Sequence, residues 1–250
     1  MKVLYEELLP YEFLEHIKEA PIAYLPLGTL EWHGEHMPLG SDGIQSQELF
    51  IRLAKRVGGV VLPKLFLGPD FAKIVDGQKL IGMDFYEGPE SKRSYPDQIL
   101  PGSAYYIKDD LYRAIIFSIA EQLARAGIRI LVAHGHGPSS NQFRMFGQEL
   151  LEQYGLYSYN CFFDEYGGNK RELGFQVDHG SSNETSIVMA CRPELVDMSR
   201  ITAPRGRTPL GLAGIDPREA ASAEIGEKAF AYTIDRMEKV LNEKLEELGY

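Results

Sequence analysis

The chain has 250 residues, of which 44% are hydrophobic and 25% are charged, as in an ordinary soluble globular protein with a sizeable core. Its formal net charge of −10 at pH 7 argues against nucleic acid and against an anionic membrane surface as partners. The longest apolar runs, such as 130–133, are strand-sized, so we expect no membrane span. Cys161 and Cys191 lack C-x-x-C spacing, and Glu6 and Glu7 stand where a signal peptide has its apolar core. We therefore expect a cytoplasmic protein with reduced thiols.

In the first part of the chain, apolar spacing predicts helices and strands in alternation. The predicted elements are a helix at 9–19, a buried strand at 22–27, an amphipathic helix at 44–57 and a strand that begins at 60. From residue 64 to residue 106 the periodicity is lost, and turn pairs such as Gly68-Pro69 recur. We interpret 64–106 as a long loop-rich insertion that serves as a lid or as an arm in an oligomer.

The second part of the chain continues the alternation. The predicted elements are a helix at 111–126, a strand at 128–133, a helix ending at Gly155, a strand at 157–163, a turn-rich connection at 167–174, a helix at 184–190 and a helix at 219–248. Alternating strands and helices predict one α/β domain over residues 1–250 with a mostly parallel central sheet. Ligands of such folds bind at the carboxyl ends of the strands.

The loop after the first strand carries three acidic residues and two histidines. Glu31 and His33 are two residues apart, so in an extended stretch their side chains point to the same side. The turn at 38–40 can bring Asp42 back toward them. One imidazole with carboxylates suits Zn²⁺, Mn²⁺ or Fe²⁺. The alternative is an acidic loop whose histidine makes an ordinary hydrogen bond. Glu35 and His36 receive no role.

A second motif, His134-Gly135-His136-Gly137, follows the predicted strand at 128–133. The glycines let the backbone and a substrate approach closely. Of the two histidines, His136 extends further past the strand, and we take it as the metal ligand. A phosphate-binding loop is the alternative interpretation, which the absence of a lysine at Walker spacing disfavours.

A third motif, Asp178-His179-Gly180, precedes Glu184 at the start of a predicted helix. Thr185 and Ser186 could simply cap that helix, where Glu184 also suits the helix dipole. However, five of the six histidines in the chain lie in these three loop motifs. That concentration favours one shared site.

Taken in order, these motifs resemble the creatininase (creatinine amidohydrolase) family over about residues 20–240. The matching stretches are Glu31-Trp32-His33-Gly34 through Asp42, Leu100-Pro101-Gly102-Ser103, Gly135-His136-Gly137, His179-Gly180 through Glu184-Thr185-Ser186, and Gly214-Ile215-Asp216-Pro217-Arg218 through Gly226. The resemblance implies a layered α/β/α fold and a homo-oligomer, commonly a hexamer. It also implies hydrolysis of a C–N bond of a small cyclic or linear amide by a metal-activated hydroxide.

The resemblance assigns roles to individual residues. It implies metal ligation by Glu31, His33, Asp42 and His136, with Asp42 bridging when two ions are bound. The cofactor is one or two divalent ions, with Zn²⁺ expected first and Mn²⁺ or Fe²⁺ as alternatives. Catalytic roles are expected for His179 as proton donor to the leaving nitrogen, Asp178 as an aid to proton transfer and Glu184 as a residue that orients a histidine. Substrate contacts are expected from Gly137, Phe175 and Ser103.

The chain also departs from creatininase itself. Pro138 replaces a glutamate that helps to hold the second ion, His134 replaces an asparagine, and Phe175 replaces a tryptophan that contacts creatinine. These departures argue against creatinine as the substrate. A formamide hydrolase or a small-peptide peptidase on the same fold remains an alternative. A non-catalytic, metal-stabilised oligomeric binding protein is a further one, which the presence of His179 beside all four ligands disfavours.

Overall fold

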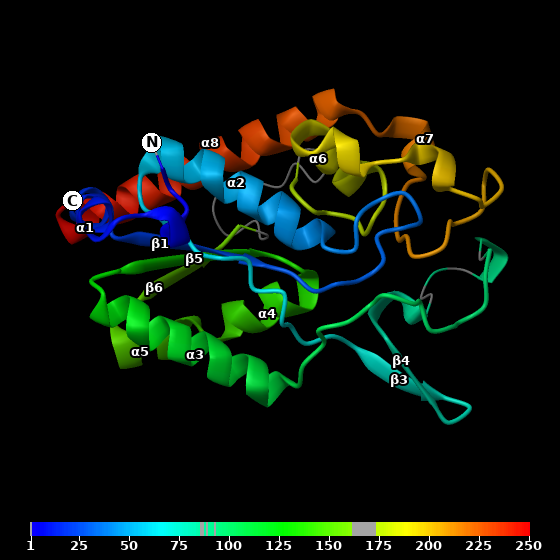
Figure 1. Cartoon of the computed structure of the whole chain (residues 1–250), viewed down its shortest axis with the longest axis horizontal. Coiled ribbons are helices and arrows are strands. Elements are labelled where there is room, and N and C mark those ends of the chain that lie inside the picture. Colours follow the sequence, from blue (N-terminus) through cyan, green and yellow to red (C-terminus); the bar gives the residue numbers. More distant parts are fainter. Residues whose placement is uncertain (1, 86–87, 89, 93, 162–173) are drawn as a thin grey trace.

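A computed structural model of the chain describes residues 2–85, 88, 90–92, 94–161 and 174–250. Its central sheet has four parallel strands in the order β2-β1-β5-β6 (Figure 1). The strands are β1 (Ile22–Leu27), β2 (Val60–Val61), β5 (Ile130–Gly135) and β6 (Tyr157–Asn160). Every residue of β1 and β5 is buried, as expected of parallel strands covered on both faces. The prediction of an α/β fold with a parallel sheet is confirmed.

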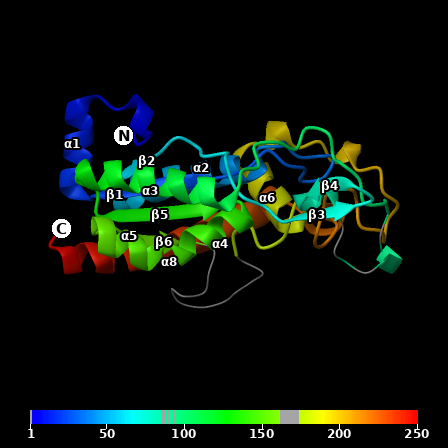
Figure 2. The same cartoon turned by 90° about the horizontal axis from the view of Figure 1, so that it is seen from below.

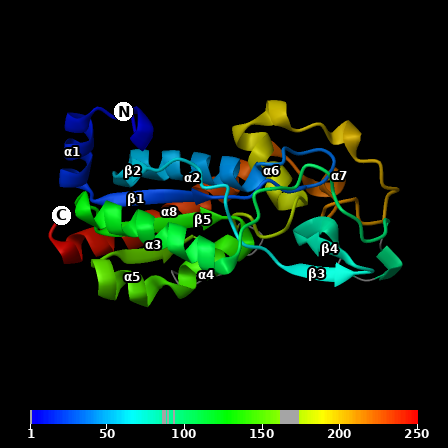
Figure 3. The ribbon, with the colours of Figure 1, turned by 60° about the horizontal axis from the view of Figure 1, so that its bottom comes forward.

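Helices cover both faces of the sheet (Figures 1 and 3). The helices are α1 (Pro10–Glu19), α2 (Ser41–Val57), α3 (Asp109–Arg125), α4 (Gly137–Met145), α5 (Gly147–Tyr154), α6 (Ser182–Cys191), α7 (Pro217–Ala220) and α8 (Ala223–Leu248). Alternate residues of β1 belong to two hydrophobic cores: Ile22 and Tyr24 pack with α2, α6 and α8, whereas Ala23 and Leu25 pack with α3, α4 and α5. The layering is therefore α/β/α.

Some element boundaries differ from the predictions. The helix predicted at 44–57 begins at Ser41, so that Asp42 lies in its first turn rather than in the preceding loop. The helix predicted at 219–248 is divided, because the Ser222 hydroxyl accepts a hydrogen bond from Ile225 N and thereby starts α8 after the short α7. The strand predicted at 157–163 is described as far as Asn160, and most of the connection predicted at 167–174 lies outside the described residues.

The segment at 64–106 contains an antiparallel hairpin of β3 (Ala72–Val75) and β4 (Gln78–Ile81), with 3-10 turns at Gly82–Asp84 and Glu90–Lys92. This hairpin lies at the end of the molecule that also holds α6, whereas both chain termini lie at the opposite end (Figures 1 and 2). Within the described residues, no helix is long and apolar enough to cross a membrane.

Candidate metal centre

The ends of β1 and β5 bring the first two motifs together. The parallel register pairs Leu27 with Gly135, the last residues of the two strands. The loop after Leu27 and His136 therefore start from the same edge of the sheet. Gly135 has φ +135°, and a Cβ at this position would lie 1.9 Å from the Leu27 carbonyl oxygen. A side chain there would thus break the strand pairing that positions the site.

His33 presents one ring nitrogen to two carboxylates. Its Nδ1 lies 3.3 Å from the Glu31 backbone oxygen. Because a carbonyl can only accept, Nδ1 carries the proton and Nε2 carries the lone pair of the neutral ring. Nε2 lies 3.3 Å from Asp42 Oδ1, in the first turn of α2, and 3.5 Å from Glu184 Oε2, in the first turn of α6. Glu184 therefore stands on the ligand side of His33.

His136 forms a similar arrangement. Its Nδ1 lies 2.8 Å from Ser139 Oγ, which leaves Nε2 to face the site. Nε2 lies 3.5 Å from Glu31 Oε1 and 3.4 Å from Asp70 Oδ2. The other oxygen of Glu31 accepts a hydrogen bond of 3.3 Å from the Tyr106 hydroxyl. His136 Nε2, Glu31 Oε1 and Asp70 Oδ2, from three separate segments of the chain, are therefore three possible metal-ligand atoms close to one another.

These spacings fit a bound cation better than they fit direct ion pairs. A charge-assisted N–H···O contact is typically about 2.7–2.9 Å long, whereas the four imidazole–carboxylate distances are 3.3–3.5 Å. Ligands about 2.1 Å from a tetrahedral ion such as Zn²⁺ lie about 3.4 Å from one another. In addition, Asp42 Oδ2 is buried and has no hydrogen-bond partner among the described residues. The donor set therefore fits a divalent ion.

The electrostatics of the cluster support the same conclusion. Burial raises the pKa of Glu31 and of Glu184. Burial alone would lower the pKa of His33, but Asp42 and Glu184 raise it to about 10. Burial alone would raise the pKa of Asp42, but the neighbouring His33 holds that pKa below its usual value. The cluster in the absence of a cation therefore retains protons, which a divalent ion could replace.

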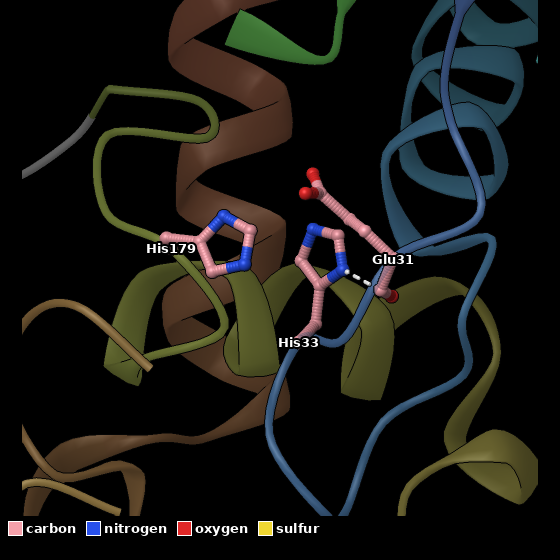
Figure 4. Close-up of side chains that lie close together, drawn as sticks. All are labelled: Glu31, His33 and His179. Atoms are coloured by element: carbon pink, nitrogen blue, oxygen red, sulfur yellow. Dashed lines mark hydrogen bonds between the residues drawn. The ribbon is translucent and has the colours of Figure 1, made fainter. Parts of the chain in front are cut away.

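His179 lies directly beside this cluster. Its ring stacks on His33 with 4.3 Å between centroids, and Figure 4 shows both rings gathered with Glu31. His179 Nε2 donates a hydrogen bond of 2.7 Å to the Trp32 carbonyl oxygen, so Nδ1 is the unprotonated nitrogen of the neutral ring. In the metal-free site, burial and then the charge of the neighbouring His33 lower the pKa of His179 to about 3, so that its ring is neutral there. A pair of backbone hydrogen bonds with Ala213 fixes the residue in place.

Asp178, expected to aid proton transfer, is engaged at the start of α6. Its two oxygens accept hydrogen bonds from the backbone nitrogens of Asn183, at 2.8 Å, and Glu184, at 3.2 Å. This arrangement satisfies amide groups that the helix itself leaves unpaired. Asp178 also lines the cavity above the cluster. Its contacts nevertheless favour a positioning role, holding Glu184 in the site.

The residues expected to contact the substrate lie in different places. Gly137 and Pro138 line a cavity of about 640 Å³ above the carboxylates and histidines. Phe175 instead packs in the core, 4.9 Å from Phe230 between ring centroids, and Ser103 hydrogen-bonds Tyr106; neither is among the cavity-lining residues described. The resemblance placed Phe175 by sequence position, but its side chain points into the hydrophobic core.

Residues without a predicted role now have structural ones. His134 Nδ1 lies 3.2 Å from Ser46 Oγ, within the core rather than at the cluster. The carboxylate of Glu35 accepts hydrogen bonds from the backbone and hydroxyl of Thr202. His36 Nε2 lies 2.8 Å from the Thr185 hydroxyl. The contacts of Glu35 and His36 join the first loop to the C-terminal part of the chain.

Two site residues were missed by the sequence analysis. Gln176 donates a hydrogen bond of 3.0 Å to Asp42 Oδ1. Asp70 faces His136 from the segment at 64–106, which also contributes apolar side chains such as Phe71 and Phe85 to the cavity wall. The one sequence feature that marks Asp70 is that it directly follows Gly68-Pro69. An aspartate in that position is equally typical of an ordinary turn, so it does not predict a site residue.

The fold and this cluster together define an α/β protein with a candidate metal centre, and known proteins are similar to the chain in sequence and in fold. The family model named Creatininase, described as creatinine amidohydrolase, matches residues 6–77 and 89–241. Creatinine amidohydrolase of Pseudomonas putida is 26% identical over an alignment of 214 residues, which covers 78% of this chain and 75% of that protein.

Solved structures agree in fold. A crystal structure of creatinine amidohydrolase (creatininase) has a TM-score of 0.72 and 22% identity, covering 97% of both chains. A structure named "Creatininase Mn" has a TM-score of 0.70 and 21% identity, covering 98% of this chain and 99% of that one. A mutant creatininase of Zn-Zn type has a TM-score of 0.72 and 22% identity, with the same coverage. The chain belongs to the creatininase family, a family of hydrolases that act on carbon–nitrogen bonds other than peptide bonds.

Proposed function

We propose that this protein is a metal-dependent amidohydrolase that cleaves a C–N bond of a small cyclic or linear amide. The observation that carries the proposal is the pair of imidazoles, His33 and His136, whose Nε2 atoms each face two carboxylate oxygens at 3.3–3.5 Å. The cavity above them, about 640 Å³, is of the size that holds small molecules.

We assign Glu31, His33, Asp42 and His136 as metal ligands, as the resemblance predicts, and add Glu184 because it faces the lone-pair nitrogen of His33. His33 and His136 belong to separate groups of candidate ligands, His33 with Asp42 and Glu184 and His136 with Glu31 and Asp70, which favours two ions. The spacing supports Zn²⁺ first, with Mn²⁺ or Fe²⁺ as alternatives. A divalent ion held here would supply a water acidic enough to act as hydroxide near neutral pH.

In this proposal, His179 moves the proton. Its Nε2–H is committed to the Trp32 carbonyl, so the free Nδ1 lone pair accepts a proton from the attacking water first. The same atom then delivers that proton to the departing nitrogen of the amide. The stacking on His33 keeps the ring beside the reacting atoms. The resemblance in sequence predicts only the second of these steps.

The surroundings of the cavity support a small, partly apolar substrate. Phe71, Met83 and Phe85 from the segment at 64–106 form an apolar part of the cavity wall, and Gly137, the first residue of α4, also lines the cavity. Backbone nitrogens at the start of a helix favour negative charge, which suits a developing oxyanion.

We further propose that the chain forms a homo-oligomer, as the resemblance implies. Three apolar side chains of α1 and its flank, Leu9, Tyr11 and Leu14, are each more than half exposed, and a subunit contact would cover them. Light scattering on the purified chain tests this assembly, with a hexamer as the expected state.

The activity is tested with a panel of small amides, before and after metal removal by a chelator. Release of ammonia or amine that is lost on chelation and restored by Zn²⁺ is the expected result. Formate as the product would identify a formamide hydrolase, and cleavage of small peptides a peptidase. A chain that binds metal but releases nothing from any substrate of the panel would favour the binding protein, and activity that survives complete metal removal would refute the proposal.

A further inference from the structure

Asp70 is a buried carboxylate in an otherwise exposed part of the chain. Only 5% of its side chain is exposed, whereas its neighbour Phe71 is 71% exposed and Ile74 in β3 is 68% exposed. Acidic side chains are rarely buried unless a cation or hydrogen bonds compensate for the lost hydration. The compensation for Asp70 therefore lies on its inward side.

The inward contacts of Asp70 point to the metal centre. Its Oδ1 accepts a hydrogen bond of 2.6 Å from Phe71 N, so that Oδ2 is directed at His136 Nε2, 3.4 Å away. A Cβ at Gly82 would lie 2.5 Å from Asp70 Oδ2, so the absence of a side chain there makes room for this orientation. The turn after β4 is thus shaped around the Asp70 carboxylate.

A simple ion pair does not account for this geometry. One proton on His136 Nε2 can satisfy one acceptor, yet both Asp70 Oδ2 and Glu31 Oε1 face it, at 3.4 Å and 3.5 Å. Both distances exceed those of charge-assisted hydrogen bonds and equal the separation of about 3.4 Å expected between ligands of one tetrahedral ion. The cavity borders Glu31, His136 and Asp70, so that water could complete the coordination of an ion held by these three residues.

We propose that Asp70 is a direct ligand of the ion at Glu31 and His136, and that it thereby ties the hairpin of β3 and β4 to the metal. This inference rests on the proposed function, because it requires that the chain bind a divalent ion. It gives the segment at 64–106 a chemical role as well as a place in the cavity wall.

The test compares Asp70→Asn with Asp76→Asn, the same substitution at the exposed tip of the same hairpin. Asp76 has φ +49°, a conformation that asparagine also tolerates. Zn²⁺ is returned to chelator-stripped protein, and the bound ions are counted by mass spectrometry while a chromophoric chelator competes for them. Asp70→Asn is expected to lower the affinity for one of the ions by about 100-fold or more. Loss of a residue that only hydrogen-bonds a ligand would lower it less. Asp76→Asn is expected to match the wild type, and an Asp70→Asn protein that also matched it would overturn the inference.

Amide hydrogen exchange over residues 72–81 gives a second readout. Zn²⁺ is expected to slow exchange in the wild type and in Asp76→Asn but not in Asp70→Asn; an equal effect in all three would contradict the tie between hairpin and ion. Should Asp70→Asn fail to fold, Asp70→Glu replaces it. This variant is expected to keep the number of ions but to shift the visible absorption of bound Co²⁺, and an unchanged spectrum would overturn the inference. A wild type that takes up no Zn²⁺ refutes the proposed function itself.

Discussion

His33 on the loop after β1 and Glu184 in the first turn of α6 face each other, with 3.5 Å between Nε2 and Oε2. The sequence predicts instead that Glu184 orients a histidine without contacting the ion itself. To orient His33 in this way, Glu184 would have to contact His33 Nδ1. That nitrogen instead donates a hydrogen bond to the Glu31 carbonyl oxygen. Glu184 therefore lies beside Asp42, on the side from which an ion would be held.

From this relationship we predict that Glu184→Gln binds the ion at His33 and Asp42 more weakly. The affinity of this site for Zn²⁺ should fall by about 10- to 100-fold or more, because a charged ligand is replaced by a neutral one. The measurement is Zn²⁺ competition with a chromophoric chelator. The control is Glu194→Gln, a substitution of an exposed glutamate that pairs with Arg192. Equal affinity in Glu184→Gln and the wild type would restore the orienting role.

A second prediction concerns His179. In His179→Gln we expect kcat to fall by about 10²- to 10⁴-fold, the usual contribution of a proton-transfer residue, while the metal content stays unchanged. The comparison variant is His16→Gln in α1, where His16 contacts the Lys2 backbone oxygen far from the site. Loss of metal in step with the loss of activity would mean that His179 is a ligand rather than a proton carrier.

A third prediction concerns the strand ends. Gly135→Ala should lower the free energy of unfolding by about 3–5 kcal/mol, since the new Cβ would collide with the Leu27 carbonyl in a conformation that disfavours side chains. Urea unfolding measures this change. Gly137→Ala is the matched control, because no atom lies within 4 Å of its added Cβ and α4 would gain from alanine. Equal stability of the two variants would show that the pairing of Leu27 with Gly135 tolerates a side chain.

A fourth prediction concerns pH. Burial, followed by the charge of His33, lowers the pKa of His36 to about 4, below its usual value of 6.5. The unfolded chain therefore binds more protons between these values, so stability is lost as the pH falls from 6.5 toward 4. Over this range the free energy of unfolding should fall less steeply in metal-free His36→Gln than in the metal-free wild type. The two slopes should differ by about 1.4 kcal/mol per pH unit at most. Urea unfolding at several pH values tests this, and identical slopes would contradict it.

The sequence specified the framework of the site better than its details. The apolar runs ending at Leu27 and Gly135 predicted buried strands, and parallel pairing places their following loops at one edge. Glu31, His33 and His136 could therefore be grouped from the order of strands and motifs alone. The direction in which Glu184 points could not be predicted, because it depends on how α6 packs.

Other features depended on contacts distant in sequence. Asp70 lies in a segment whose turn residues are those of an ordinary loop, and its contact with His136 forms only once the hairpin packs against the site. The analogy with a tryptophan predicts that Phe175 contacts the substrate. In the structure its ring packs against Phe230 of α8 in the hydrophobic core. The break between α7 and α8 follows from one serine cap, a weak local signal.

The central claim is that His33 and His136 hold divalent ions through their Nε2 atoms. Anomalous X-ray diffraction at the zinc absorption edge, from crystals of the Zn²⁺-loaded wild type, tests it most directly. The account predicts anomalous peaks about 2.1 Å from each Nε2. Well-ordered crystals at saturating Zn²⁺ that show no peak beside either histidine would contradict it.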